Sequence, residues 1–220
     1  MSIDNKIILK PWGYEYSVYE NKSFSVWLLH IKENEFTSMH CHPRKKTKLI
    51  LLDGQAKISL LSEDKIINPL SFVFFDRGQF HSTRAMSKNG IYLLEIESPV
   101  DKDDLVRLSD KYGRENKNYE FDSYKISTSE RFHINFDDNS LINFSGCDFN
   151  LVNYISFSDL PCEDNCIFIM LEGSIKCILN NKKHNLIIPG DVIKSKDFSL
   201  IKNKISQVSK DCKILVVSKR

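Results

Sequence analysis

Short apolar runs separated by polar turn residues dominate the hydrophobic pattern of the chain. The runs are rich in β-branched and aromatic residues, and most have Asn, Asp, Gly or Pro close to one end, which is typical of β-strands. They span residues 24–31, 47–52, 55–61, 71–75, 90–96, 151–157, 166–171, 174–179, 186–188, 191–193 and 212–217. Many short strands at this spacing predict an all-β sandwich or barrel.

The pattern changes once, at residues 101–113. Acidic residues open this segment, apolar residues follow at 105, 108 and 112, and Gly113 suits the position after a helix end. We therefore expect a short helix, followed by a polar linker at 114–119. This places a domain boundary between residues 115 and 116, giving domains 1–115 and 116–220.

The two halves of the chain form a weak internal repeat. Residues 49–58 align with residues 168–177, including Gly54 with Gly173, and Pro69 then aligns with Pro189. The repeat predicts two copies of one β-domain. Within the first copy, Asp53-Gly54 predicts a hairpin between the flanking runs, because type I′ turns need positive φ at both central residues.

Composition and charge restrict the class of protein. Of the 220 residues, 41% are apolar, including 14 Phe and 8 Tyr, which is enough for a hydrophobic core. The 31 Lys and Arg are interleaved with 29 Asp and Glu, which disfavours a nucleic-acid partner. With no signal-peptide pattern at the start and no apolar run of membrane-spanning length, we expect a cytoplasmic protein without a membrane partner.

The most specific chemical feature is the pair His40 and His42. Residues two apart on a strand point to the same side, and a third histidine, His81, follows another predicted strand and the turn at residues 76–79. Three imidazoles arranged in this way would hold one divalent transition metal, with Zn, Fe, Mn and Ni all left open by the sequence.

These histidines resemble the two motifs of the cupin superfamily, in which His40-x-His42 is followed by a glycine at 54 and by Gly78-x-x-His81. Residues 10–15, Lys-Pro-Trp-Gly-Tyr-Glu, are similar to the opening of the mannose-6-phosphate isomerase-like cupins of sugar-nucleotide and polysaccharide biosynthesis. The resemblance covers residues 8–100 and continues only around Gly173 and Pro189. It implies two tandem jelly-roll barrels, joined here by the short helix and linker, and a homodimer. Counting from Gly173 and Pro189, the positions that match His40, His42, Thr47 and His81 are Asp159, Pro161, Cys166 and Ile201. These residues form no plausible ligand set, so we expect the second barrel to lack metal ligands.

The chain departs from the cupin motif at Thr47, where the family usually has a glutamate. A threonine hydroxyl is a poor ligand for a divalent ion, so the sequence predicts three imidazoles with open positions for water or an anionic ligand.

Further candidate residues follow from charge and position. Arg77, Arg84 and Arg44 lie close to the histidines in sequence and are candidates for binding a phosphate or carboxylate. The candidate catalytic residues, which could move a proton, are Glu95, Glu97 and Tyr14, with Glu15 as another base.

The resemblance implies a metal-dependent enzyme that isomerises or epimerises a phosphorylated or nucleotide-linked sugar in surface polysaccharide biosynthesis. Two alternatives remain open at this point. One is a non-catalytic sugar-binding cupin, and the other is a three-histidine Fe(II) dioxygenase.

Overall fold

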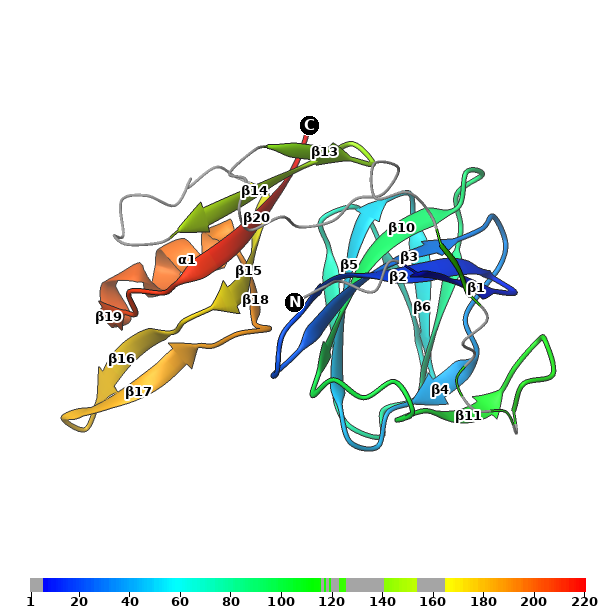
Figure 1. Ribbon diagram of the computed structural model, residues 1–220, viewed down its shortest axis with the longest axis horizontal. Coiled ribbons are helices and arrows are strands. Elements are labelled where there is room, and N and C mark those ends of the chain that lie inside the picture. Colours follow the sequence, from blue (N-terminus) through cyan, green and yellow to red (C-terminus); the bar gives the residue numbers. More distant parts are fainter. Residues whose placement is uncertain (1–5, 116, 118, 120–122, 126–140, 154–164) are drawn as a thin grey trace. The chain divides into compact units, whose positions relative to one another are not determined.

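The computed structural model describes residues 6–115, 117, 119, 123–125, 141–153 and 165–220, and it contains two compact units, Met1–Ile134 and Asn135–Arg220 (Figure 1). The strands of the first unit are β1 (Lys6–Lys10), β2 (Gly13–Glu20), β3 (Ser25–Ile31), β4 (Met39–Cys41), β5 (Lys46–Asp53), β6 (Ala56–Leu60), β7 (Asp64–Ile67), β8 (Phe72–Phe75), β9 (His81–Ala85), β10 (Ile91–Ser98), β11 (Val106–Ser109) and β12 (Ser123–Lys125). The second unit contains β13 (Ile142–Phe144), β14 (Cys147–Asn153), β15 (Cys166–Glu172), β16 (Ile175–Leu179), β17 (Lys182–Ile187), β18 (Val192–Lys194), α1 (Ser195–Ile201), η2 (Lys202–Lys204), β19 (Ile205–Val208) and β20 (Lys213–Lys219).

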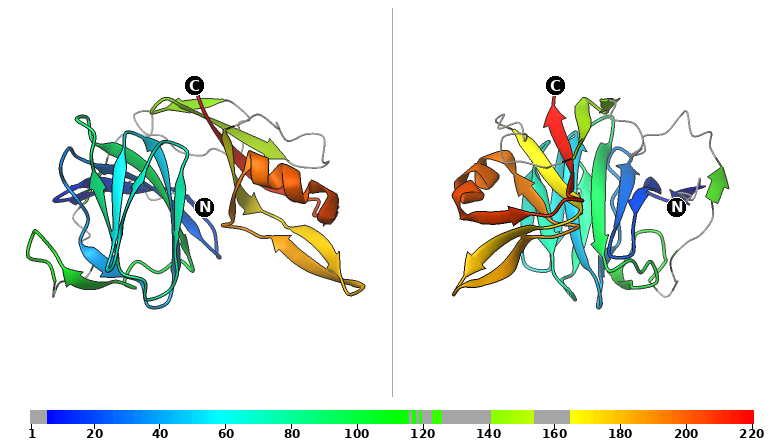
Figure 2. Two further views of the ribbon diagram at one scale, coloured as in Figure 1. Left: turned by 180° about the vertical axis from the view of Figure 1, so that it is seen from behind. Right: turned by 60° about the vertical axis from the view of Figure 1, so that its left-hand side comes forward.

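The first unit is built from two antiparallel sheets, ordered β12-β1-β2-β3-β10-β5-β8 and β11-β4-β9-β6-β7. Alternate residues of β3, β5 and β10 form one side of its core, as the period of two along a strand requires. Trp27, Leu49 and Leu93 come from the larger sheet, and Ile58 and Ala85 from the smaller one. The two views in Figure 2 show how the strands of this unit are arranged.

The predicted all-β class is confirmed, since α1 is the only α-helix in the described part of the chain. No helix among the described residues is both long enough and apolar enough to cross a membrane. The compact units divide after Ile134 and not after residue 115, because β12 still pairs with β1 of the first unit.

The predicted helix at residues 101–113 is wrong. This segment contains β11, which pairs with β4 through Val106 opposite Cys41 and Arg107 opposite His40. Its apolar spacing does not mark a buried face, because Leu108 is 57% exposed. The backbone groups of residues 106–109 find their partners on another strand, so local helical spacing does not decide the structure.

The predicted hairpin at Asp53-Gly54 is also wrong, although a turn is present. β5 belongs to the larger sheet and β6 to the smaller one, so the turn carries the chain between sheets. Gly54 has φ +82°, and a Cβ there would lie 2.8 Å from the carbonyl oxygen of Gly90. Only Gly54 of the two turn residues has positive φ, so the turn is not type I′.

The second unit repeats the strand order of the first, which confirms the internal repeat. The neighbours β3-β10-β5-β8 and β9-β6-β7 correspond to β14-β20-β15-β18 and β19-β16-β17. In the first unit, the backbone of Leu51 forms hydrogen bonds of 3.0 and 2.8 Å with residues 71 and 70. The backbone of Met170 forms the same pair, at 2.9 and 2.8 Å, with residues 191 and 190.

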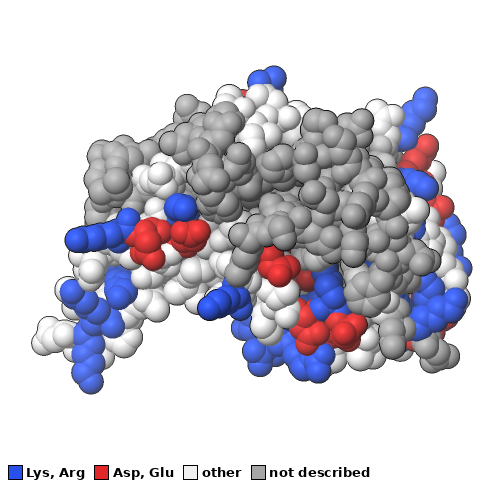
Figure 3. Space-filling view, viewed as in Figure 1, with Lys and Arg blue, Asp and Glu red and all other residues white. Residues whose placement is uncertain are grey.

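Helix α1 lies between β18 and β19, where the first unit has only a loop between β8 and β9. Phe198 of α1 packs edge-on against Phe168 of β15, with 5.6 Å between ring centroids, and both belong to the core of the second unit. Figure 2 shows α1, in orange, beside the strands of its own unit. On the face drawn in Figure 3, Asp and Glu side chains lie next to several of the Lys and Arg side chains of the described residues.

Candidate metal centre

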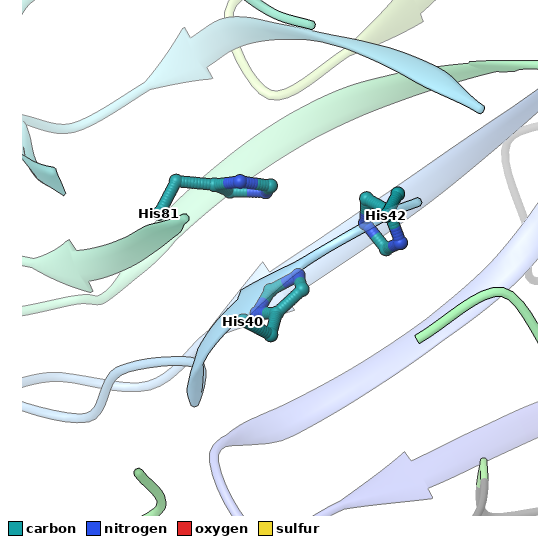
Figure 4. Close-up of side chains that lie close together, drawn as sticks. All are labelled: His40, His42 and His81. Atoms are coloured by element: carbon teal, nitrogen blue, oxygen red, sulfur yellow. The ribbon is translucent and has the colours of Figure 1, made fainter. Parts of the chain in front are cut away.

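Three histidines converge at the start of β9 and the end of β4. His40 lies on β4 directly opposite His81, the first residue of β9, and His42 follows β4 by one residue. The ring centroids are 4.5 Å apart for His40 and His81, 5.0 Å for His40 and His42, and 5.6 Å for His42 and His81. Their candidate ligand atoms all lie within 4.8 Å of one another. Figure 4 shows the rings drawn together from the two strands.

Each of the three rings is oriented by a backbone carbonyl. Nδ1 of His40 lies 2.8 Å from the Ser38 oxygen, Nδ1 of His42 lies 2.6 Å from the Asp104 oxygen, and Nδ1 of His81 lies 3.0 Å from the Gln79 oxygen. A carbonyl oxygen only accepts, so Nδ1 carries the proton in each ring and Nε2 keeps its lone pair. This is the arrangement that metal-binding histidines use.

Burial keeps the three imidazoles neutral, as metal binding requires. Loss of solvation, followed by the charge of neighbouring groups, lowers the pKa of His40 and of His42 to about 3 and lowers that of His81 well below its usual value. Nε2 of His42 is buried and has no hydrogen-bond partner. A buried, unprotonated and unpartnered nitrogen facing two others fits a divalent transition ion.

Two carboxyl groups lie beside the histidines. Glu95 and Glu97 are two residues apart on β10, both are buried, and their ligand atoms lie within 4.8 Å of that of His42. Glu97 accepts a hydrogen bond from Lys45 Nζ at 2.5 Å, and its other oxygen is 2.9 Å from Lys102 Nζ. Burial would raise the pKa of Glu97, but the Lys102 and Lys45 ammonium groups outweigh burial and hold this pKa at about 2. Burial and the charge of Glu97 raise the pKa of Glu95 to about 7.

A cavity opens beside this centre in the first unit. Lys102 lies over the Trp27 ring at 3.7 Å, Lys10 lies over the Tyr119 ring at 3.6 Å, and the Tyr119 hydroxyl donates to Glu15. The lining residues are Lys10, Trp12, Glu15, Leu29, Thr37, Ser38, His40, His42, Lys45, Glu95, Glu97, Lys102, Leu105, Arg107, Arg114 and Tyr119. The cavity is therefore lined by both lysines and carboxylates, together with His40 and His42.

The structure places four predicted site residues away from this cavity. Tyr14 packs against the rings of Tyr16 and His30, on the face of β2 opposite to Glu15. Of the predicted arginines, Arg77 is exposed in the loop before β9, Arg84 is exposed and stacks on Phe36 at 4.7 Å, and Arg44 is paired with Asp101 at 2.7 Å. None of these residues is among those that line the cavity.

Other residues of the cavity were not anticipated from the sequence. Lys102, Lys10 and Arg107 line it, and Asp104 orients His42 from a position far along the chain. The one available signal was for Lys10, which begins the Lys-Pro-Trp-Gly-Tyr-Glu segment. Lys102 lies inside the segment predicted to be helical, so its place beside the strands could not be inferred.

Within the described residues, both groups of possible metal ligands lie in the first unit. Of the positions that correspond to the three histidines and Thr47, Asp159 and Pro161 fall outside the described residues, and Cys166 is buried in β15. Ile201 ends α1, so the helix between β18 and β19 disrupts the simple count that matched it to His81.

Comparison with known proteins locates the relationship in the first unit. Residues 3–110 match the family model described as mannose-6-phosphate isomerase C-terminal. A mannose-1-phosphate guanylyltransferase of Salmonella montevideo is 31% identical over 114 residues, which cover 51% of this chain and 24% of that protein. The xanthan biosynthesis protein XanB of Xanthomonas campestris is 25% identical over 109 residues, covering 49% of this chain and 23% of that protein. The matched region thus spans about a quarter of the length of these curated relatives.

Solved structures give more distant likenesses. KdgF from a Halomonas species has a TM-score of 0.41 at 15% identity, covering 43% of this chain and 86% of that chain. A putative sugar phosphate isomerase from Acidithiobacillus ferrooxidans has a TM-score of 0.36 at 18% identity, covering 41% and 63%. Because both the TM-scores and the identities are low, no function follows from these two likenesses. The fold and the family match together identify the first unit as a cupin domain, and over residues 3–110 it is similar to the mannose-6-phosphate isomerase C-terminal family.

Proposed function

We propose that the first unit is a metal-dependent cupin enzyme that isomerises or epimerises a phosphorylated or nucleotide-linked sugar in polysaccharide biosynthesis. The family match and the names of the relatives support the substrate class. The observation that carries the proposal is the convergence of three neutral imidazoles beside the buried carboxyl group of Glu95. A divalent ion held by His40, His42 and His81 would supply a Lewis acid for a sugar carbonyl.

The base in this proposal is Glu95. An aldose–ketose isomerisation moves a proton between neighbouring carbons, so it needs a group that accepts and returns a proton near neutral pH. Burial and the neighbouring Glu97 raise the pKa of Glu95 to about 7, which suits that task. Glu97 is held by Lys45 and Lys102, so it stays charged and cannot serve as the same kind of shuttle.

Positive charge for an anionic substrate comes from lysines in place of the predicted arginines. Lys10 and Lys102 line the cavity, and the Lys102 side chain is only 15% exposed. Lys102 and Arg114 both already have a carboxylate beside them, Glu97 at 2.9 Å from Lys102 Nζ and Asp110 at 2.6 and 2.8 Å from the Arg114 guanidinium. The bidentate pair of Arg114 is the more firmly fixed of the two. An ammonium group in such a setting attracts a phosphate by charge more than by fixed geometry.

The test is a joint measurement of metal content and turnover. We expect the wild-type chain, purified without chelator, to carry one transition metal and to interconvert mannose 6-phosphate and its ketose isomer. His40→Ala should lose the metal and the activity, whereas Glu95→Gln should keep the metal and lose about 100-fold or more in rate. His184→Ala, which removes an exposed histidine on β17, is the matched control. Equal metal content in the wild type and His40→Ala would refute the metal centre.

The same measurements separate the two alternatives. A non-catalytic sugar-binding cupin would bind metal and sugar without turnover, and the presence of Glu95 next to His42 argues against it. A dioxygenase would consume oxygen in the presence of Fe(II). The homodimer implied by the cupin resemblance is part of the proposal, and light scattering of the purified chain would test it.

A further inference from the structure

Thr47 and Glu97 face each other across neighbouring strands. They are directly opposite in the ladder between β5 and β10, and residues opposite each other in an antiparallel pair point to the same side of the sheet. Thr47 is fully buried, and its hydroxyl oxygen has no hydrogen-bond partner. The side of β5 that faces the histidine site therefore offers no charged ligand, while the adjacent strand places a carboxylate next to it.

His42 connects that carboxylate to the three-histidine site. It belongs both to the group with His40 and His81 and to the group with Glu95 and Glu97, each within 4.8 Å. Of the two glutamates, Glu97 lies opposite Thr47, whereas Glu95 lies two residues away along β10, opposite Leu49. Glu97 is thus the carboxylate better placed to reach an ion bound at Nε2 of His42.

We propose that Glu97, contributed by β10, is a fourth protein ligand of the ion held by His40, His42 and His81. This inference rests on the proposed metal centre and adds to it a carboxylate ligand opposite Thr47. A carboxylate has two oxygens. Glu97 keeps its hydrogen bond to Lys45 through Oε1. Its Oε2 is buried and 2.9 Å from Lys102 Nζ but accepts no hydrogen bond, so this oxygen is the one offered to the ion. Carboxylates that bind metals in proteins are themselves hydrogen-bonded in this way.

In this proposal Lys45 holds the Glu97 carboxylate in position. Lys45 is 2% exposed and lies 2.5 Å from Glu97, and it also donates to the Asp101 carbonyl at 3.0 Å. These contacts fix the position of the carboxylate before any ion arrives. Glu95 lies 4.0 Å from Lys102 Nζ, further than Glu97 from either lysine. Its carboxyl group therefore remains available for proton transfer and is not needed as a ligand.

The test measures Zn²⁺ affinity of the metal-stripped full chain by competition with a chelating dye. Glu97→Gln preserves side-chain size and removes the charge, and Glu95→Gln is the matched control on the same face of β10. We expect the Kd for Zn²⁺ to rise at least about tenfold in Glu97→Gln and to stay within about twofold of wild type in Glu95→Gln.

A variant that should regain Zn²⁺ affinity tests whether a loss of affinity comes from misfolding. Glu97→Thr alone should bind Zn²⁺ weakly, whereas Thr47→Glu combined with Glu97→Thr moves the carboxylate to the opposite strand and should recover about tenfold or more of the lost affinity. A misfolded chain would not regain affinity in this way.

Three results would overturn the inference: wild-type affinity in Glu97→Gln, equal losses in Glu97→Gln and Glu95→Gln, or no recovery in the double variant. A wild-type chain that binds no Zn²⁺ through His40 and His42 would instead refute the metal centre of the proposed function. The two failures are therefore distinguishable.

Discussion

At the scale of single residues, Asp104 holds the loop that carries His42. Its main-chain oxygen accepts the Nδ1 proton of His42 at 2.6 Å, and its side-chain Oδ2 accepts the backbone N–H groups of Arg44 and Lys45, both at 2.8 Å. The residue is 2% exposed. One buried residue thus fixes the backbone at Lys45 through its carboxylate and the ring orientation of His42 through its main-chain oxygen.

Replacing Asp104 with Ala should weaken both the fold and the metal site. Two backbone N–H groups lose their acceptor, and the one on Lys45 is buried, so we expect a loss of about 1–3 kcal/mol in the free energy of unfolding. Zn²⁺ affinity should fall about tenfold, because the loop that carries His42 loses the two side-chain hydrogen bonds that hold its backbone, although the main-chain oxygen of residue 104 remains. Urea unfolding and metal titration measure the two effects. Asp103→Ala, at an exposed neighbour, is the control, and equal behaviour of the two variants would contradict the prediction.

The histidine site could be predicted from sequence because two of its members are two residues apart on one strand. Strand alternation alone brings His40 and His42 to the same side, and the position of His81 after a turn completes the motif. The cationic residues could not be predicted in the same way. Arg84 is close to His81 in sequence but points outward, whereas Lys102 is remote in sequence and lies in the cavity. Register between strands, which sequence spacing does not supply, decides such positions.

At the scale of elements, the turn between β5 and β6 depends on a glycine in close contact with another turn. Gly54 has φ +82°, and a Cβ on it would lie 2.8 Å from Gly90 O and 2.9 Å from a methyl group of Ile91. Gly78, in the loop before β9, has a similar φ of +74°, but a Cβ there would meet nothing within 4 Å. Comparing substitutions at these two glycines therefore distinguishes the cost of the left-handed backbone from the cost of a steric clash.

Gly54→Ala should destabilise the first unit more than Gly78→Ala. Both substitutions carry the cost of a left-handed backbone, about 1 kcal/mol. Gly54→Ala also forces the backbone of residues 54 and 90 apart, which we expect to add about 1–3 kcal/mol. Urea unfolding followed by circular dichroism would measure both. Losses of the same size in the two variants would show that the contact with Gly90 does not matter.

The predicted strands were confirmed where each apolar run packs in a core, as in β3, β5, β10 and β15. The segment 101–113 was misjudged because its structure depends on a partner far away. β11 gains its hydrogen bonds from β4, and Val106 and Leu108 remain 47% and 57% exposed. Apolar spacing indicates a helix only when it marks a buried face, and the exposed fraction of these residues is not readable from the sequence.

At the scale of the whole molecule, the buried neutral histidines make the stability of the metal-free protein depend on pH. The pKa of His40 and of His42 is lowered to about 3 by burial, and that of His81 is well below the value of 6.5 that holds when the chain is unfolded. Between these values the unfolded chain binds more protons than the folded one, so stability falls as the pH falls. Glu95, with its raised pKa of about 7, acts in the opposite direction, but it is one group against three.

We therefore expect the metal-free chain to lose stability as the pH is lowered from about 7 to about 5. Each histidine whose effect is not offset by Glu95 contributes up to about 1.4 kcal/mol per pH unit. Urea unfolding at several pH values measures this slope. His40→Gln, which removes one titrating imidazole, should show a shallower slope. A wild-type slope that is flat, or that matches the slope of His40→Gln, would contradict the assignment of buried neutral histidines.

A bound ion should act on only one of the two units, because both groups of possible ligands among the described residues lie in the first unit. An ion that binds only the folded site stabilises it by about 2.7 kcal/mol at a free concentration 100 times Kd. We expect amide exchange, measured by mass spectrometry with and without Zn²⁺, to slow in residues 39–45 and 79–85 of the first unit. Residues 166–179, which carry the corresponding strands β15 and β16 of the second unit, should exchange at the same rate in both conditions, and His42→Ala should abolish the difference in the first unit. Equal slowing in both units would mean that zinc acts on the chain at large and not through the histidines between β4 and β9.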